Sequence, residues 1–143
     1  MKIVLNQNII KFNFEDFNID FSRPLGKGGF SDVYKATEKT TGKVYAIKRI
    51  SSDEDNEEEI NNMLFMNKCE NSIKYYGCFQ KENFIYLIME LCDCSLDQLI
   101  NEKNLNVKEI KEIFEQLNNV FKMMYDKSLI HRDIKPENIL IKN

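Results

Sequence analysis

Residues 131–138 read His-Arg-Asp-Ile-Lys-Pro-Glu-Asn, and this octet decides what the rest of the chain must be. Asp133 carries a carboxylate that can accept the proton of a hydroxyl group. Lys135 carries a cation that can neutralise a phosphoryl group, and Asn138 carries an amide oxygen of the kind that binds magnesium. Taken alone, the octet is also compatible with a capped polar loop. The upstream sequence therefore has to decide between the two interpretations.

A glycine-rich stretch, Gly-Lys-Gly-Gly-Phe-Ser-Asp-Val, occupies residues 26–33 and lies between two predicted strands. Dinucleotide-binding turns and P-loops run instead from a strand into a helix. A glycine-rich turn between two strands lets backbone N–H groups lie over phosphates, because no Cβ blocks the close approach. An ordinary hairpin turn is the alternative, since glycines alone are a weak signal.

Lys48 ends the apolar stretch Val-Tyr-Ala-Ile-Lys at residues 44–48. A lysine at a strand end is commonly a solvated edge charge. Antiparallel pairing with the strand that follows the glycine-rich turn would instead bring Lys48 beneath that turn, where its ammonium could hold phosphates. Glu59 is its predicted partner, because Glu59 lies four residues before Met63 and shares its helix face. A solvated acidic face over residues 57–59 is the alternative.

The hydrophobic pattern changes near residue 95, from short alternating runs to helical periodicity. The alternating runs predict a short strand or lead-in at 9–14 and strands over 19–25, 32–37, 43–50, 73–80 and 84–91. A helix is predicted from the acidic run at 51–59 to about Asn67. The later part predicts helices over 95–102 and 107–126, a polar loop over 131–138 and a short strand over 139–141.

The composition restricts the function further. A chain of 143 residues with 43% apolar residues and a net charge of −3 predicts one soluble domain with no nucleic-acid partner. No apolar run is long enough to cross a membrane, so no membrane partner is expected. The four cysteines and the single histidine lack the spacing of a zinc site. With no secretory leader, the expected location is cytoplasmic, where disulfides are rare.

Together these motifs resemble those of the eukaryotic protein kinases. The resemblance covers residues 19–143 and rests on four segments in family order, namely GKGGFSDV at 26–33, VYAIK at 44–48, the gatekeeper and hinge segment YLIMELC at 86–92, and HRDIKPEN at 131–138. It implies an α+β fold, with a small lobe of one five-stranded antiparallel sheet and an αC helix, then a hinge and the first helices of an incomplete large lobe. The implied boundaries are a lead-in at 1–18, a small lobe over 19–89, a hinge over 90–94 and the start of the large lobe over 95–143.

The resemblance also implies a reaction, in which the γ-phosphoryl group of ATP passes, with Mg²⁺, to a serine or threonine hydroxyl of a protein substrate. Asp133 would be the catalytic base, and Lys135 would act beside it as in the Ser/Thr-specific branch. Lys48 would grip the phosphates and pair with Glu59. Asn138 would bind the magnesium ion.

The same resemblance implies how the nucleotide is held. Met89 would be the gatekeeper, and the backbone groups of Glu90 and Cys92 would bind the adenine edge. The other implied nucleotide-binding residues belong to the glycine-rich turn, to the walls around the adenine, or to the phosphate-binding strand: Leu25, Gly26, Lys27, Gly28, Gly29, Phe30, Ser31, Asp32, Val33, Ala46, Lys48 and Leu140.

Three features depart from the family pattern. Ser31 replaces the third glycine, and the interval from Lys48 to Glu59 is about one helical turn shorter than usual. The sequence also ends at Asn143 before any Asp-Phe-Gly, so a metal-binding aspartate and the activation segment are expected to be missing. We therefore expect these residues to be inactive alone, and a truncated nucleotide-binding or protein-interaction module without catalysis is the alternative function.

The helix predicted over 107–126 carries an apolar stripe at intervals of three or four residues. Its members are Val107, Ile110, Phe114, Leu117, Phe121 and Met124. In whole kinases this stripe packs inside the large lobe. We expect it to be only partly covered in this chain, which would favour self-association or capture by a chaperone.

Overall fold

The computed structural model describes residues 12–28, 31–52 and 56–142, except for the side chains of residues 56–59. The chain forms two compact units. Unit 1 comprises Met1–Phe65 and Ile73–Leu91, and unit 2 comprises Met66–Ser72 and Cys92–Asn143. Unit 2 is therefore built from two separate stretches of the chain.

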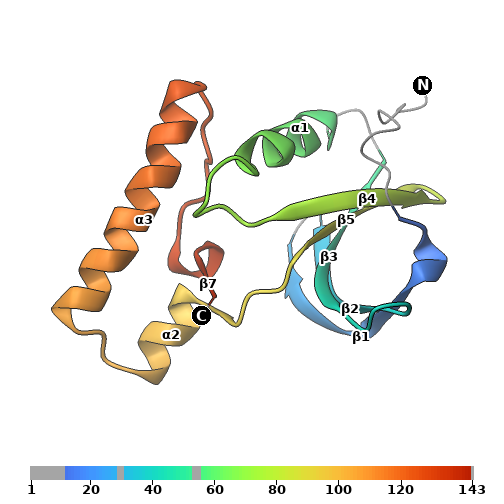
Figure 1. Cartoon of the computed structure of the whole chain (residues 1–143), viewed down its shortest axis with the longest axis horizontal. Helices are drawn as coiled ribbons and strands as arrows, with labels where there is room; N and C mark the ends of the chain where they lie inside the picture. Colours follow the sequence, from blue (N-terminus) through green and yellow to red (C-terminus); the bar gives the residue numbers. More distant parts are fainter. Residues whose placement is uncertain (1–11, 29–30, 53–55, 143) are drawn as a thin grey trace. The chain divides into compact units, whose positions relative to one another are not determined.

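Unit 1 is built on a five-stranded antiparallel sheet with the strand order β1-β2-β3-β5-β4 (Figure 1). Tight turns join neighbouring strands: Gly42 between β2 and β3 has a φ of +71°, and Glu82 between β4 and β5 has a φ of +54°. The sheet and helix α1 confirm the predicted α+β fold. The strands and helix are β1 (Phe17–Lys27), β2 (Ser31–Glu38), β3 (Val44–Ser51), α1 (Asn56–Met66), β4 (Tyr75–Lys81) and β5 (Phe84–Glu90).

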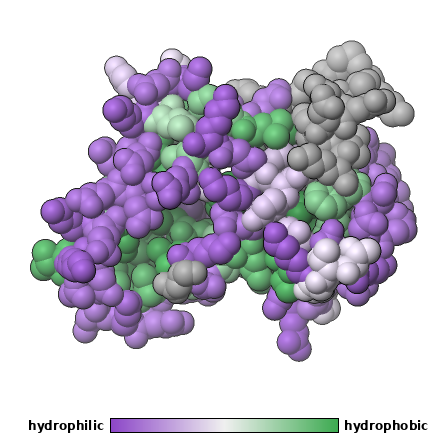
Figure 2. All heavy atoms as spheres, viewed as in Figure 1, coloured by the Kyte–Doolittle hydropathy of each residue, from purple (hydrophilic) through white to green (hydrophobic). Residues whose placement is uncertain are grey.

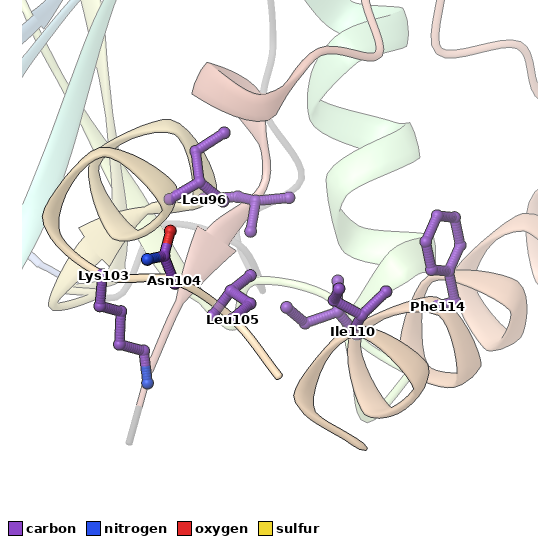
Figure 3. Close-up of a pocket in the computed structure, with 8 residues that line it drawn as sticks. Leu96, Lys103, Asn104, Leu105, Ile110 and Phe114 are labelled. Atoms are coloured by element: carbon purple, nitrogen blue, oxygen red, sulfur yellow. The ribbon is translucent and has the colours of Figure 1, made fainter. Parts of the chain in front are cut away.

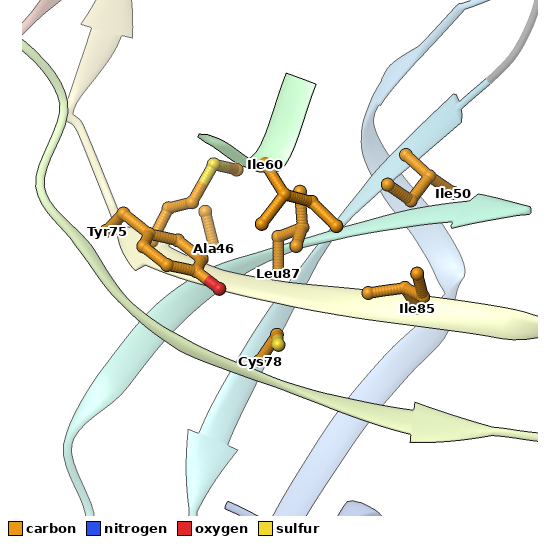
Figure 4. Close-up of a cluster of buried hydrophobic side chains, with 8 residues drawn as sticks. Ala46, Ile50, Ile60, Tyr75, Cys78, Ile85 and Leu87 are labelled. Atoms are coloured by element: carbon orange, nitrogen blue, oxygen red, sulfur yellow. The ribbon is translucent and has the colours of Figure 1, made fainter. Parts of the chain in front are cut away.

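One face of this sheet carries an aliphatic core that α1 covers (Figure 4). Ile60 of α1 is only 1% exposed and belongs to the same buried cluster as Ile50 and Leu87. Each such side chain stabilises the fold by roughly 1.5–3 kcal/mol when fully buried. Side chains alternate along a strand, so Ala46 and Lys48 share this face of β3 with Ile50.

The opposite face carries an aromatic core. The ring of Phe79 stacks on Tyr86 with the centroids 4.9 Å apart and on Phe17 at 5.8 Å. Phe14 meets the ring of Phe79 edge to face at 6.0 Å. Phe14 opens the 3-10 turn η1 (Phe14–Asp16), which therefore helps to cover the aromatic face.

Of the short strand or lead-in predicted at 9–14, the described residues 12–14 form no strand and fit the lead-in, while residues 9–11 lie outside the described residues. The Asn13 amide donates to Asp16 Oδ2 at 2.7 Å, and the Asp16 amide donates to Asn13 O at 3.1 Å. These local bonds close a turn and compete with strand pairing. The loose alternation of apolar residues left a strand or a lead-in open, and the structure shows Phe12 and Phe14 packed against the aromatic face of the sheet.

Unit 2 contains α2 (Leu96–Glu102), α3 (Val107–Asp126), the 3-10 turn η2 (Pro136–Asn138) and two short strands, β6 (Cys94–Ser95) and β7 (Leu140–Ile141). Both helices begin at side-chain caps. Ser95 Oγ accepts from the Gln98 amide at 3.2 Å, and Asn106 Oδ1 accepts from the Glu109 amide at 3.0 Å. The α3 helix has the bounds predicted from its periodicity.

A pair of amide hydrogen bonds ties α3 to the separate stretch Met66–Ser72. Asn71 Nδ2 donates to Gln116 Oε1 at 3.1 Å, and Asn119 Nδ2 donates to Asn71 Oδ1 at 3.2 Å. These contacts join α3 to a stretch that begins at Met66, the last residue of α1.

The helices of unit 2 are poorly covered. Neither α2 nor α3 contains a buried residue, and Val107 and Phe114 are 83% and 67% exposed. Figure 2 shows apolar surface where Figure 1 draws these helices. The apolar stripe of α3 is thus only partly covered, as predicted. Within the described ranges, no helix is long and apolar enough to cross a membrane.

Candidate functional site

Four predicted nucleotide-binding residues lie on one face of the sheet in unit 1. Lys48 of β3 is opposite Val33 of β2, and Ala46 of β3 is opposite Met89 of β5. Ala46 and Met89 are each 7% exposed and belong to the aliphatic core, against which Val33 packs. The structure therefore brings an ammonium group and an apolar surface to the same part of the sheet.

Strands β1 and β2 stay paired up to the residues that flank the tip of the glycine-rich turn. Gly26 is opposite Val33, Lys27 is opposite Asp32, and the Gly28 amide donates to Ser31 O at 2.8 Å. A Cβ added to Gly28 would lie 3.2 Å from Ser31 O, so a side chain here would require this backbone contact to open by a few tenths of an ångström.

Of the other residues predicted for this site, the structure describes some and not others. Leu25 lies on β1 and is 52% exposed. Gly29 and Phe30 lie outside the described residues. Glu59 belongs to α1, but its side chain lies outside the described part, so its pairing with Lys48 stays a prediction.

Asp32 has a partner that the sequence analysis missed. Arg49 Nη2 lies 2.8 Å from Asp32 Oδ2. Because successive side chains of a strand point to different faces, this pair lies on one face of the sheet and Lys48 lies on the other. The signal was present in the sequence, because a residue next to Lys48 on a strand must point to the other face. Pairing of the two predicted strands would have placed it near Asp32.

The predicted hinge residues divide between the units. In unit 1, Glu90 Oε1 accepts from the Lys74 amide at 2.8 Å, and the Glu90 amide donates to Lys74 O at 2.9 Å. In unit 2, the Asp93 amide donates to Ile141 O at 2.9 Å, directly after Cys92. Because Ser95 pairs with Leu140, this bonding brings Leu140 beside the chain segment that follows Cys92.

The octet at 131–138 folds back on itself in unit 2. The Asn138 Nδ2 group donates to Asp133 O at 2.9 Å and to Asp133 Oδ2 at 2.7 Å. Lys135 Nζ lies 3.2 Å from the same Oδ2 atom. The turn η2 makes these contacts possible. The backbone N–H of Asn138 donates to Lys135 O at 2.9 Å, and this bond returns the chain toward Asp133. The three predicted catalytic and metal-binding side chains of the octet are thus in contact.

This arrangement favours the ionised form of Asp133. The hydrogen bond from Lys135, followed by that from Asn138, lowers the pKa of the Asp133 carboxyl. The carboxylate remains 61% exposed. Asp133 is therefore negatively charged at neutral pH and open to a hydroxyl group from outside, as a proton acceptor must be.

The octet also fits part of a magnesium site. In the described residues, no three side chains of the His, Cys, Asp or Glu type gather to hold a metal ion. Magnesium is commonly bound by one or two protein oxygens together with substrate phosphates. Asn138 uses its Nδ2 group to bond Asp133, and its amide oxygen is an acceptor of the kind that suits such a partial site.

Residues 19–143 match the family model of the protein kinase domain. The chain belongs to the protein kinase family. In this kinase-family chain the match includes the candidate residues of the sheet in unit 1 and, separately, the octet of unit 2.

Curated relatives agree with this assignment. Calcium-dependent protein kinase 29 of Arabidopsis thaliana is 32% identical over 132 residues, which cover 85% of this chain and 25% of the relative. Serine/threonine-protein kinase cst-1 of Caenorhabditis briggsae is 34% identical over 127 residues, with coverages of 85% and 26%. Serine/threonine-protein kinase KIC1 of Saccharomyces cerevisiae is 36% identical over 126 residues, with coverages of 83% and 12%. The chain thus spans about a quarter or less of the length of these relatives.

Proposed function

We propose that this kinase-family chain provides the nucleotide-binding sheet and the catalytic loop for transfer of the ATP γ-phosphoryl group to serine or threonine hydroxyls of a protein substrate. The observation that carries the proposal is the contact of Asp133 with both Lys135 and Asn138. Family membership and the names of two relatives support the serine/threonine class.

In this proposal the residues of unit 2 act on the acceptor side of the reaction. Asp133 accepts the proton of the attacking hydroxyl at its carboxylate, which Asn138 holds in place. Lys135 offsets negative charge beside Asp133, so that an anionic phosphoryl group can come near. Magnesium bound with ATP supplies further neutralisation of phosphate charge, and Asn138 is the proposed ligand for it.

The residues of unit 1 act on the nucleotide side. The Lys48 ammonium binds phosphate oxygens, and the backbone of the glycine-rich turn covers them. Val33, Ala46 and Met89 offer the apolar surface for the adenine ring. Catalysis of this kind depends on positioning more than on covalent chemistry, so the rigidity of the sheet matters directly.

Nucleotide binding can be tested with the 143-residue polypeptide by isothermal titration with ATP, with and without magnesium. We expect weak binding of ATP, with a smaller effect of magnesium than in whole kinases. Lys48→Met should weaken ATP binding, whereas Lys108→Met on the exposed surface of α3 should leave it unchanged. A folded sample that binds no ATP would contradict the proposal.

Phosphotransfer can be tested with any longer product of the gene that contains these 143 residues, presented with three peptides that differ only in carrying serine, threonine or tyrosine as the acceptor. We expect phosphate on serine and threonine and not on tyrosine. Binding of ATP without any transfer by that product would instead favour a nucleotide-binding or interaction module without catalysis.

We also propose the cytoplasm as the location of this protein. The support is chemical: none of the four cysteines takes part in a disulfide, as suits a reducing compartment. Fractionation of cells with an antibody against the chain would test this location.

A further inference from the structure

A charged pair lies behind the glycine-rich turn, on the face of the sheet that the proposed reaction does not use. Arg49 Nη2 is 2.8 Å from Asp32 Oδ2, and the Tyr34 hydroxyl donates to the same oxygen at 3.1 Å. The Arg49 and Asp32 side chains are 30% and 26% exposed. The pair is thus partly withdrawn from water, where ion pairs are stronger than at an open surface.

Aromatic rings hold the arginine in place. The Arg49 guanidinium carbon lies 5.4 Å from the centre of the Tyr34 ring and 4.9 Å from the centre of the Phe84 ring. Cation–π contacts of this kind favour arginine over lysine, because the planar guanidinium can stack and form an ion pair at once. The side chain therefore has little freedom, and the pair acts as a rigid link between β2 and β3.

The strand register places this link next to the proposed phosphate site. Asp32 is opposite Arg49, and the neighbouring Val33 is opposite Lys48. Successive side chains point to opposite faces, so the ion pair backs the part of the sheet from which Lys48 extends. The turn itself closes one residue earlier, where the Gly28 amide bonds to Ser31 O at 2.8 Å.

We propose that Asp32 and Arg49 are positioning residues that fix the exit of the glycine-rich turn relative to Lys48, and so control affinity for the phosphates of ATP. This inference rests on the proposed function, since it concerns the same nucleotide site. It predicts a selective effect. Loss of the pair weakens binding of the phosphates but not of the adenosine part, which contacts other residues.

The test measures the affinities of ATP and of adenosine for the wild-type chain and for Asp32→Asn, Arg49→Met, Arg49→Lys and the double variant Asp32→Asn/Arg49→Met. We expect the ratio of ATP to adenosine affinity to fall about threefold to tenfold in the first two variants. The ratio for the double variant should fall no further than that for either single variant, because each single substitution already breaks the same ion pair. Arg49→Lys keeps the charge but not the stacking, so its ratio should be intermediate.

Glu38→Gln is the matched control, because it also removes one negative charge from β2, at the end far from the turn. Its ratio should equal that of the wild type. Melting temperatures show which variants are folded. If the other variants unfold, the ratio of ATP to adenosine affinity of Arg49→Lys is the test of the inference. An unchanged ratio in folded variants overturns the inference while the proposed function stands. No ATP binding by the wild type overturns both.

Discussion

Asp133 is held from two sides, by the Lys135 ammonium and by the Asn138 amide. Both contacts favour the charged carboxylate, so the pKa of Asp133 is lowered. The stabilisation that these contacts give the folded loop is present above the pKa of an unfolded aspartate, and is lost as the pH falls through the lower pKa of the folded state. The loop should therefore keep its geometry through the neutral range.

This shift can be measured by carbon NMR of the Asp133 carboxyl during an acid titration. The midpoint should lie below that of an aspartate in a short peptide. Lys135→Met removes the largest cause of the shift, so the midpoint should move upward. Lys108→Met, at a side chain that is 86% exposed on α3, is the control and should leave the midpoint of Asp133 unchanged.

The role of Asp133 as a base gives a second prediction at this scale. In any longer product of the gene that is active, Asp133→Asn should lower phosphotransfer by about 10²–10⁴-fold, the usual contribution of a positioned base. The affinity for ATP should hardly change, because the base acts on the acceptor hydroxyl. Asp126→Asn should alter neither quantity, and an Asp133→Asn protein that kept most of its rate would refute the assigned role.

The stability of the sheet in unit 1 depends on the packing of its aromatic face. Phe79 is 2% exposed and contacts the rings of Phe14, Phe17 and Tyr86. Phe79→Ala should therefore cost about 3–5 kcal/mol of stability, enough to unfold a marginal domain. Phe114→Ala makes the same change at a side chain that is 67% exposed, and should cost under about 0.5 kcal/mol. Urea unfolding of both variants, followed by circular dichroism, compares them.

The start of α3 depends on a reciprocal cap. Asn106 Oδ1 accepts from the Glu109 amide, Glu109 Oε2 accepts from the Asn106 amide, and Lys103 Nζ bonds to Glu109 Oε1 at 2.7 Å. Asn106→Ala should cost the helix about 0.5–2 kcal/mol, seen as faster hydrogen exchange in its first turn. Asn118→Ala within the helix is the control, and exchange there should not accelerate.

The same cap is sensitive to acid. The hydrogen bond from Lys103, followed by that from the Asn106 amide, lowers the pKa of Glu109. Protection of the first turn should therefore be complete at neutral pH and decline as the pH falls through the titration of Glu109. Glu109→Gln should remove this pH dependence. Equal exchange rates in the first turn of wild-type α3 at all pH values would contradict the predicted sensitivity of the cap to acid.

Elements with strong local signals could be predicted from the sequence, and those that depend on distant partners could not. The α3 helix has a complete periodic stripe and a cap, so its bounds followed directly. Strand β7 lies within the short strand predicted over 139–141, whereas β6 has no local signal, because Cys94 and Ser95 pair only once the octet has returned the chain to Ile141. At the site, motifs named Lys48, Asp133 and Asn138, whereas no motif names Arg49, whose place beside Asp32 follows from the register of β2 and β3.

Across the whole chain, burial is concentrated in unit 1. Of the buried apolar side chains in the described residues, only Cys69 belongs to unit 2. The apolar side chains between α2 and α3 instead line an open pocket of about 320 Å³ (Figure 3). Few buried contacts imply low local stability, so the 143-residue chain should be more dynamic over residues 95–143 than in its sheet.

Hydrogen exchange and light scattering of the purified 143-residue chain test this expectation. Amides over 107–126 should exchange faster than those of β3, and exposed apolar surface should produce self-association that grows with concentration. Phe114→Ser should reduce the association, while Lys111→Ser on the same helix should not. A monodisperse monomer with equal protection in α3 and β3 would show that unit 2 is stable without further cover.

The discontinuity of unit 2 has a consequence for inheritance. Recombination at a single crossover between Leu91 and Cys92 would separate Asn71 from Gln116 and Asn119, which bond to it. A chimaera made this way would combine a foreign Met66–Ser72 stretch with the native α3, and the amide pairing would survive only if both parents shared it. An exchange that keeps both native partners of this pairing therefore has to carry two pieces of the gene, Met66–Ser72 and Cys92–Asn143.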